Sequence, residues 1–148
     1  MKQVQIKPLQ FFNEKGEPFI TITYHRDYVL AKWHGHVTAD EVIEAASGYL
    51  AYLQQYPCSK LLNDKSNVTG DWQDANDWLE YDWLPKAYDA GLRCMAHIYS
   101  LSMFSQLSAL DLQQRVVPPL QMKNFTDFDT ALNWVLHCEN NEKPLPTT

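Results

Sequence analysis

The sequence lacks the features that place a chain in a membrane or on nucleic acid. No stretch approaches the roughly 20 consecutive apolar residues that span a bilayer, and the first residues hold no signal-peptide-like apolar run. Lysine and arginine number 12 against 18 acidic residues, a net charge of −6, and they form no cluster. We therefore expect no membrane insertion and no nucleic-acid partner.

Cysteine is scarce as well. Cys58, Cys94 and Cys138 are odd in number, lie far apart and form no Cys-x-x-Cys pair. This pattern is typical of free, buried thiols. We therefore expect unpaired thiols in a soluble protein of the reducing cytoplasm. A glycine-rich phosphate loop is also missing, which disfavours a nucleotide, and we expect no cofactor.

The composition that remains is that of one globular domain. The 148 residues are 45% hydrophobic and 20% charged, which is ordinary for a folded chain. Aromatic residues reach 13%, so some rings are expected at a surface or a contact. We divide the chain into an N-terminal arm or edge strand (1–18), one domain (19–138) and a flexible tail (139–148).

Strand and helix patterns alternate through the domain. Residues 19–24 and 28–33 are predicted to form an antiparallel hairpin. Thr38 and Glu41 form a capping-box pattern before a helix that Pro57 ends. Strands are then predicted at 60–65, 92–99 and 120–125, and helices at 71–82, within 100–114, and after Thr126 as the cap of the last helix. Such alternation favours parallel pairing in an α/β sheet.

The 71–82 helix carries unusual aromatic residues. Trp72, Leu79 and Trp83 share one face and are predicted to be core. Trp78 and Tyr81 fall on the acidic side, where a core role fails, so we expect them at a protein contact or over an apolar pocket. The alternative is shielding by a neighbouring segment. Pro85 is expected to break or kink this helix.

Four short segments and the order of elements resemble a known family. The segments are WHGHVT (33–38), LLND (61–64), AGLR (90–93) and FTDFDTALNW (125–134). They resemble the SpoIIAA-like group of small bacterial proteins, described as STAS/SEC14-like domains. The resemblance implies a single α/β domain, with a mixed sheet of four to five strands packed with about four helices.

The resemblance also bears on function. STAS domains are mostly regulatory modules rather than enzymes, and some are switched by phosphorylation of a serine in an Asp-Ser-Ser-Gly-like motif. Residues 67–71 lack that motif, so we expect no such switch. The SEC14 side of the resemblance implies a lipid-like or other apolar ligand.

One polar cluster follows the predicted central strand. Asp64, Ser66, Asn67 and Thr69 lie between that strand and the next helix, where free amides can bind an anion or carboxylate. Turn formation alone is the alternative explanation. We take these four residues, with Trp78 and Tyr81, as the ligand- or partner-binding candidates.

Metal and catalytic sites are weakly supported. His34 and His36 make an incomplete ligand pair, and we expect no metal. His97 cannot pair directly with Cys94 or Ser100, because side chains alternate along a strand. We expect His97 to be half-buried and hydrogen-bonded to a neighbour, and we identify no catalytic residues.

We therefore expect a non-enzymatic regulatory or protein-interaction domain that binds a protein partner or itself as a homodimer. An alternative is a small apolar or lipid-like ligand in a pocket between the 71–82 helix and residues 100–114, lined by Met95, Met103 and Phe104. A weaker alternative is a small enzyme that uses Asp64 or a histidine as base.

Overall fold

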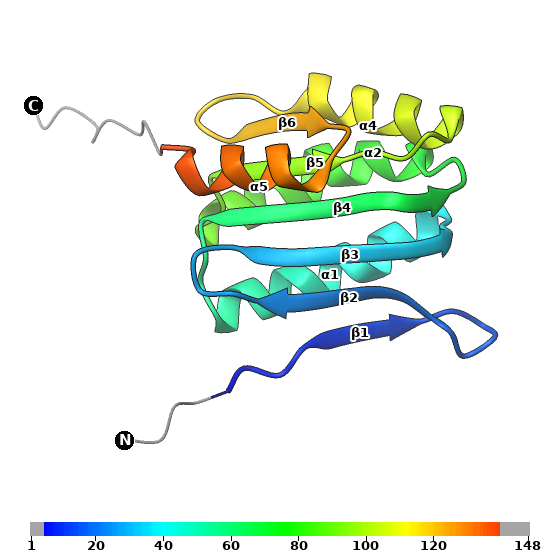
Figure 1. Cartoon of the computed structure of the whole chain (residues 1–148), viewed down its shortest axis with the longest axis horizontal. Coiled ribbons are helices and arrows are strands. Elements are labelled where there is room, and N and C mark those ends of the chain that lie inside the picture. The colour runs from blue at the N-terminus through cyan, green and yellow to red at the C-terminus, as the bar shows by residue number, and fades with distance from the viewer. Residues whose placement is uncertain (1–4, 140–148) are drawn as a thin grey trace, which may run out of the picture.

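Six strands form one mixed sheet in the order in which they follow one another along the chain (Figure 1). The computed structural model describes residues 5–139. The pairs β1–β2 and β2–β3 are antiparallel, and the pairs from β3 to β6 are parallel. The strands are β1 (Leu9–Phe12), β2 (Pro18–Tyr24), β3 (Val29–His36), β4 (Lys60–Thr69), β5 (Cys94–Ile98) and β6 (Gln121–Phe125).

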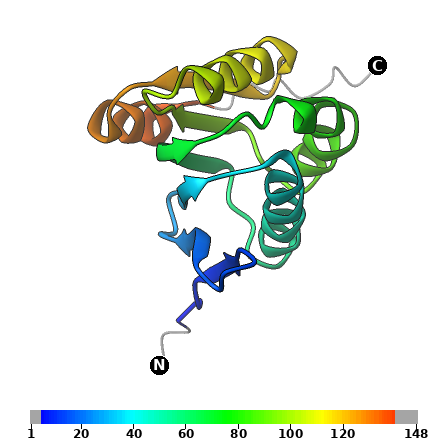
Figure 2. The same cartoon turned by 90° about the vertical axis from the view of Figure 1, so that its right-hand side faces the viewer.

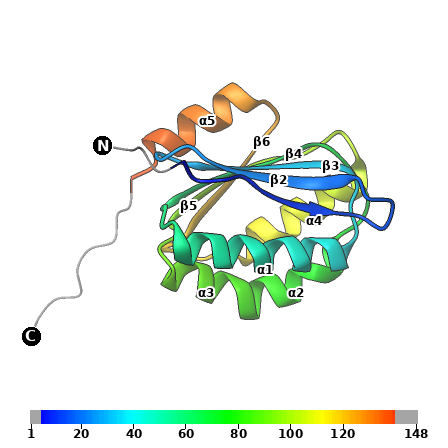
Figure 3. The ribbon, with the colours of Figure 1, turned by 90° about the horizontal axis from the view of Figure 1, so that it is seen from below.

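The helices divide unequally between the two faces of the sheet. They are α1 (Ala39–Gln55), a compound helix made of a 3₁₀ turn (Gln73–Ala75), α2 (Asn76–Trp78), a π turn (Leu79–Trp83) and α3 (Leu84–Asp89), then α4 (Met103–Arg115) and α5 (Phe128–His137). Figure 3 shows α1 to α4 on one face and α5 on the other.

This division follows from the strand order. The parallel strands advance in one direction from β3 to β6, and parallel crossovers are right-handed in nearly all proteins. Every crossover helix must then cover the same face. The last helix, α5, follows the final strand and is free to cover the opposite face. Figure 2 shows α1 and α5 on opposite sides of the strands, with α4 at the β6 end.

The predicted α/β class is confirmed, with one strand more than expected. The additional strand is β1, which pairs with β2 at the edge of the sheet. The hairpin of β2 and β3 agrees with the sequence, and β6 lies at the other edge of the sheet. The tail predicted at 139–148 lies outside the described residues, apart from Glu139.

The helix starts were predicted with mixed success. Thr38 caps α1 as expected, since its hydroxyl accepts the amide of Glu41 (3.2 Å) and the Glu41 carboxylate accepts the amide of Thr38 (3.0 Å). Thr126 was the wrong cap for α5. Asp127 accepts the amide of Thr130 (2.9 Å), and this bond holds the pKa of the Asp127 carboxyl below its ordinary value.

The helix predicted at 71–82 and the short helical piece predicted after Pro85, through Tyr88, form one compound helix, so Pro85 does not break it. The chain stays helical from Gln73 to Asp89. Proline has no amide proton to donate to the preceding turn. The π turn Leu79–Trp83 lies directly before α3, where Leu84 bonds back to the carbonyl of Leu79, so the wider turn accommodates the proline.

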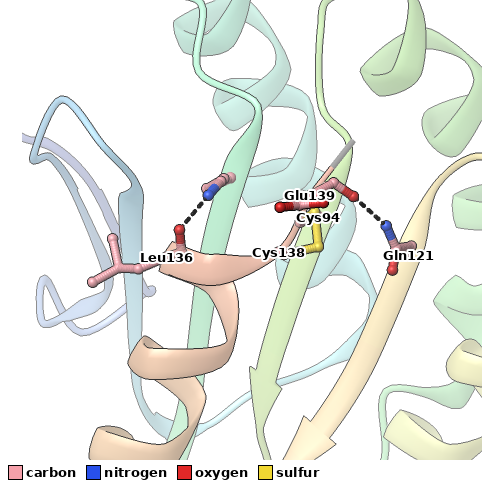
Figure 4. Close-up of a disulfide and its surroundings, with 6 residues drawn as sticks. Cys94, Gln121, Leu136, Cys138 and Glu139 are labelled. Atoms are coloured by element: carbon pink, nitrogen blue, oxygen red, sulfur yellow. Dashed lines mark hydrogen bonds between the residues drawn. A yellow bond between two sulfur atoms is a disulfide. The ribbon is translucent and has the colours of Figure 1, made fainter. Parts of the chain in front are cut away.

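The prediction of free thiols is wrong for two of the three cysteines. Cys94 on β5 and Cys138 after α5 form a disulfide, with their Cα atoms 6.4 Å apart (Figure 4). Packing of α5 against the sheet brings together two residues that are 44 positions apart. Cys58 is free and buried. Disulfides persist mainly in oxidising compartments, so the cytoplasmic expectation loses the support of unpaired thiols.

Two hydrogen bonds near the disulfide hold the same segment to the sheet. The Lys60 ammonium donates to the carbonyl of Leu136, and the Gln121 amide donates to the carbonyl of Glu139 (3.0 Å; Figure 4). The end of α5 is therefore attached to β4, β5 and β6 together.

No helix among residues 5–139 is long and apolar enough to cross a membrane.

Candidate functional site

The predicted polar turn after the central strand is part of the strand. The strand β4 continues to Thr69, and the register to β3 shifts from Lys32–Asp64 to His34–Asn67, which leaves one extra residue in β4. The Asp64 carboxylate is buried and accepts the amide of Ser66 (2.9 Å).

The other residues of this cluster are exposed near the end of β4. They are Ser66, Asn67 and Thr69, and the Thr69 hydroxyl lies 3.4 Å from Nδ1 of His36. None of the four stands at a helix N-terminus, because the compound helix begins at Gln73. We expected free backbone amides here that could bind an anion. Instead, this segment pairs with β3 as part of the sheet.

Trp78 and Tyr81 have different environments. Trp78 is half-buried and packs against the main core, so the prediction that no core role fits it is wrong. Tyr81 is 75% exposed, as its position on the acidic side predicted. It lines a surface groove between α3 and residues 117–120, together with Pro85 and Val117. The predicted core residues Trp72, Leu79 and Trp83 are buried.

The helix α4 has an inverted distribution of side chains. Its buried residues are Ser105, Ser108, Ala109 and Leu112, three of them small. Its exposed residues are large and apolar: Met103 (70%), Phe104 (61%), Leu107 (50%) and Leu110 (44%). These four positions follow one another at i, i+1, i+4 and i+7, so they share one side of the helix. We call them the outer α4 face.

Polar contacts hold α4 to the compound helix. The buried Asn76 amide donates to the carbonyl of Ser108 and to the Asp111 carboxylate, both at 3.0 Å. The indole of Trp72 donates to the hydroxyl of Ser105 (3.2 Å). The Trp72 bond gives the inward-facing Ser105 hydroxyl a partner, and the Asn76 bonds hold the Ser108 backbone and the Asp111 carboxylate.

An ion-pair cluster adds to this attachment at the end of α4. Arg115 pairs with Asp77 (2.7 Å), Glu80 (3.0 Å) and Asp111 (3.0 Å). The two charged residues of α4, Asp111 and Arg115, are thus engaged with each other and with the compound helix. The outer α4 face itself carries no charge.

A small cavity lies between the sheet and the helices. Its volume is about 40 Å³, and most of its walls are apolar, from Ile20 and Met95 on the sheet to Leu79 and Leu112 on the helices. Three polar side chains also line it, namely Tyr49, Asn63 and Lys65. Asn63 accepts the indole proton of Trp33 at 2.5 Å.

Lys65 is the least expected residue in this core. Its side chain is 2% exposed, and its ammonium lies 3.4 Å from the centroid of the Trp72 ring and 4.6 Å from that of Trp33. No carboxylate among residues 5–139 is within ion-pair distance of it. Burial lowers the pKa of the Lys65 amine well below its ordinary value.

His97 stands beside Lys65 in the same core. Its ring stacks on Trp72 with centroids 5.9 Å apart. The ring is fully buried and both nitrogens lack a hydrogen-bond partner within the described chain, so the prediction of a half-buried, bonded histidine is wrong. Burial first, and the nearby Lys65 second, lower the pKa of His97 well below its ordinary value.

The predicted ligand pocket is only partly found. A cavity does lie between the compound helix and α4, and Met95 lines it. Met103 and Phe104 were placed wrongly, because both belong to the exposed outer α4 face. The volume of about 40 Å³ is far below that of a pocket for a lipid-like ligand.

The other histidines and Asp64 do not converge into a catalytic arrangement. His34 and His36 line an open surface depression with Glu41 and Glu44. Within residues 5–139, no group of three His, Cys, Asp or Glu side chains is placed to hold a metal. Lys65 and His97 are buried near each other and both have lowered pKa values, and of these two the sequence had drawn attention to His97 alone.

One signal in the sequence could have identified Lys65. Leu61, Asn63 and Lys65 share one face of β4, the face that meets the helices. Because the predicted strand ends at residue 65, Lys65 is interpreted as the polar end of the strand rather than as a core residue. The spacing of Ser105, Ser108, Ala109 and Leu112 at i, i+3, i+4 and i+7 places them on one side of α4, but it does not tell whether that side or the apolar side is buried.

The chain is similar in fold to a protein of known structure. No protein-family model matches the chain, and no curated protein matches it. A solved structure of an uncharacterized protein from the DUF3478 family with a SpoIIAA-like fold, from Shewanella loihica PV-4, aligns with a TM-score of 0.49 and 18% identity. The alignment covers 78% of this chain and 91% of that chain.

Proposed function

We propose that this protein is a non-enzymatic interaction domain whose outer α4 face binds a second copy of the chain. The observation that carries the proposal is the inversion of α4, which buries Ser105 and Ser108 while it exposes Phe104 and Leu107. Contiguous exposed apolar side chains are typical of contact surfaces.

The size of the face sets the expected affinity. Full burial of one large apolar side chain is worth about 1.5–3 kcal/mol, and these four are already partly covered, so about 1 kcal/mol each is a reasonable gain. Eight side chains in a dimer then contribute roughly 8 kcal/mol, against an association cost of about 4–15 kcal/mol. The two are of the same order, so the dimer should be weak and dependent on concentration.

The absence of charge on the face favours a second copy over a different partner. The chain carries a net charge of −6, so most pairings of two copies would bring like charges together. The outer α4 face avoids this repulsion. An uncharged, apolar patch is also self-complementary across a two-fold axis, as homodimer interfaces commonly are. The regulatory role implied by the resemblance would act through this pairing.

Size-exclusion chromatography with light scattering over a range of protein concentrations tests the proposal. The wild-type mass should rise from 17.2 kDa toward twice that value as concentration increases. Leu107→Glu should stay at the monomer mass, because two buried carboxylates would face each other. Leu136→Glu introduces the same charge on α5, which covers the opposite face of the sheet from α4, and this variant should behave like wild type.

Two results would overturn the proposal. One is a wild-type mass that remains that of the monomer at the highest concentration reached. The other is a Leu107→Glu variant that associates as wild type does. Trp78→Asp is a poor probe of the interface, because Trp78 packs against the core and its replacement would destabilise the monomer.

A further inference from the structure

The cavity behind the helices combines an amine, a hydroxyl and apolar walls. Lys65 and Tyr49 both line it and both are buried. The Tyr49 hydroxyl has no hydrogen-bond partner among the described residues, although a buried hydroxyl normally has one. An unpaired buried hydroxyl that faces the same cavity as a lysine indicates that a polar atom of a ligand belongs between them.

We propose that this cavity binds a small uncharged aldehyde, which Lys65 holds as a Schiff base. This inference is independent of the pairing proposed for α4, because the cavity lies on the inner side of the helices. It concerns reversible covalent binding and requires no turnover.

The environment of Lys65 supplies the reactive form of the amine. A lysine must be deprotonated to act as a nucleophile, and desolvation in an apolar pocket is one of the ways in which proteins achieve this. Lys65 lies among rings and apolar walls, and no carboxylate in the described part of the chain forms an ion pair with it. Lys15, by contrast, lies on the surface with its side chain exposed to water.

The reaction balances without an oxidant or reductant. The Lys65 nitrogen adds to the carbonyl carbon, a C–N bond forms, and the nitrogen proton passes to the oxygen to give a carbinolamine. The C–O bond then breaks, the second nitrogen proton leaves with the hydroxyl as water, and the imine remains. Burial raises the pKa of the Tyr49 hydroxyl, so it keeps its proton, and it would donate a hydrogen bond to the carbonyl oxygen during addition and to the imine nitrogen once water has left.

The cavity limits the size of the ligand. A site needs roughly 10–15 Å³ of this volume to hold one water molecule. The cavity, at about 40 Å³, therefore has room for about three or four non-hydrogen atoms. Acetaldehyde and propanal satisfy this limit, whereas an aromatic aldehyde exceeds it.

Reductive trapping tests the inference. Purified full-length protein is incubated at pH 7 with propanal and sodium cyanoborohydride, and the adducts are mapped by peptide mass spectrometry over time. Lys65 should gain a propyl group at least about tenfold faster than surface lysines, since each unit of pKa changes the free-amine fraction tenfold. Benzaldehyde should label surface lysines and leave Lys65 unmodified.

Variants show whether the cavity is responsible. Lys65→Met, which keeps the volume and is expected to fold, should lose the fast adduct, and Lys15→Met on an exposed turn should retain it. Tyr49→Phe should slow the fast reaction by about tenfold or more. Surface labelling by propanal with Lys65 unmodified would overturn the inference, as would a fast adduct that persists in Lys65→Met.

Discussion

The helices α1 and α4 cover the same face of the sheet but are held to it in different ways. Helix α1 buries large side chains such as Tyr49 and Leu53 and exposes polar ones such as Glu44. Helix α4 buries Ser105 and Ser108 and exposes its large apolar residues. Hydrophobic burial therefore holds α1 within the monomer, whereas hydrogen bonds and ion pairs hold α4 and leave its apolar surface available for association.

The largest expected effect separates the two helices directly. Leu53→Ala removes a fully buried side chain of α1 and should lower the free energy of unfolding by about 2–5 kcal/mol. Leu107→Ala on α4 should stay within about 0.5 kcal/mol of wild type, because its side chain is half exposed. Urea unfolding at low protein concentration, where the chain is monomeric, measures both. Equal losses of unfolding free energy in the two variants would contradict the proposed difference between α1 and α4.

A second substitution tests the polar attachment of α4. Asn76→Ala deletes the donor that binds the Ser108 carbonyl and the Asp111 carboxylate. A buried acceptor left without its partner costs about 1–3 kcal/mol, which should appear in thermal or urea unfolding. Asn67→Ala, at an exposed position on β4, is the matched control and should be nearly neutral. An unaffected Asn76→Ala variant would mean that these bonds contribute little.

A third experiment uses pH to examine the core behind the helices. Burial lowers the pKa of Lys65, so the unfolded chain binds more protons than the folded chain below the ordinary lysine pKa. Stability should therefore rise with pH, by up to about 1.4 kcal/mol per pH unit for this group. The difference in unfolding free energy between wild type and Lys65→Met, measured from pH 7 to 9, isolates the effect from other groups. If the unfolding free energies of wild type and Lys65→Met changed in parallel with pH, Lys65 would be charged in the folded protein.

His97 contributes in the same direction at lower pH. Because its pKa is also lowered, stability should fall as the pH drops through and below the ordinary histidine value of about 6.5. Lys65→Met should retain this acid-side loss while it loses the alkaline-side gain.

The sequence predicts the local parts of this fold well. The capping box of Thr38 and Glu41, the hairpin of β2 and β3 and the buried Trp72 all follow from spacing and residue type. The alternation of helices and strands predicts the parallel sheet, and right-handed crossovers place the helices on one face.

Tertiary contacts account for what the sequence did not predict. Strand β4 continues past Lys65 because two indole rings from distant segments, Trp33 and Trp72, surround that side chain. The disulfide between Cys94 and Cys138 requires the packing of α5 to be known. The outward direction of Phe104 and Leu107 depends on the bonds that the compound helix makes to α4, which residue composition does not reveal.

Hydrogen–deuterium exchange at low and high protein concentration tests the central claim, that α4 presents an apolar surface to a second copy, most directly. The account predicts that raising the concentration slows amide exchange in α4 and leaves exchange in α1 unchanged, and that Leu107→Glu removes the effect. Exchange in α4 that does not depend on concentration, or slowing that appears at another surface instead, would contradict it.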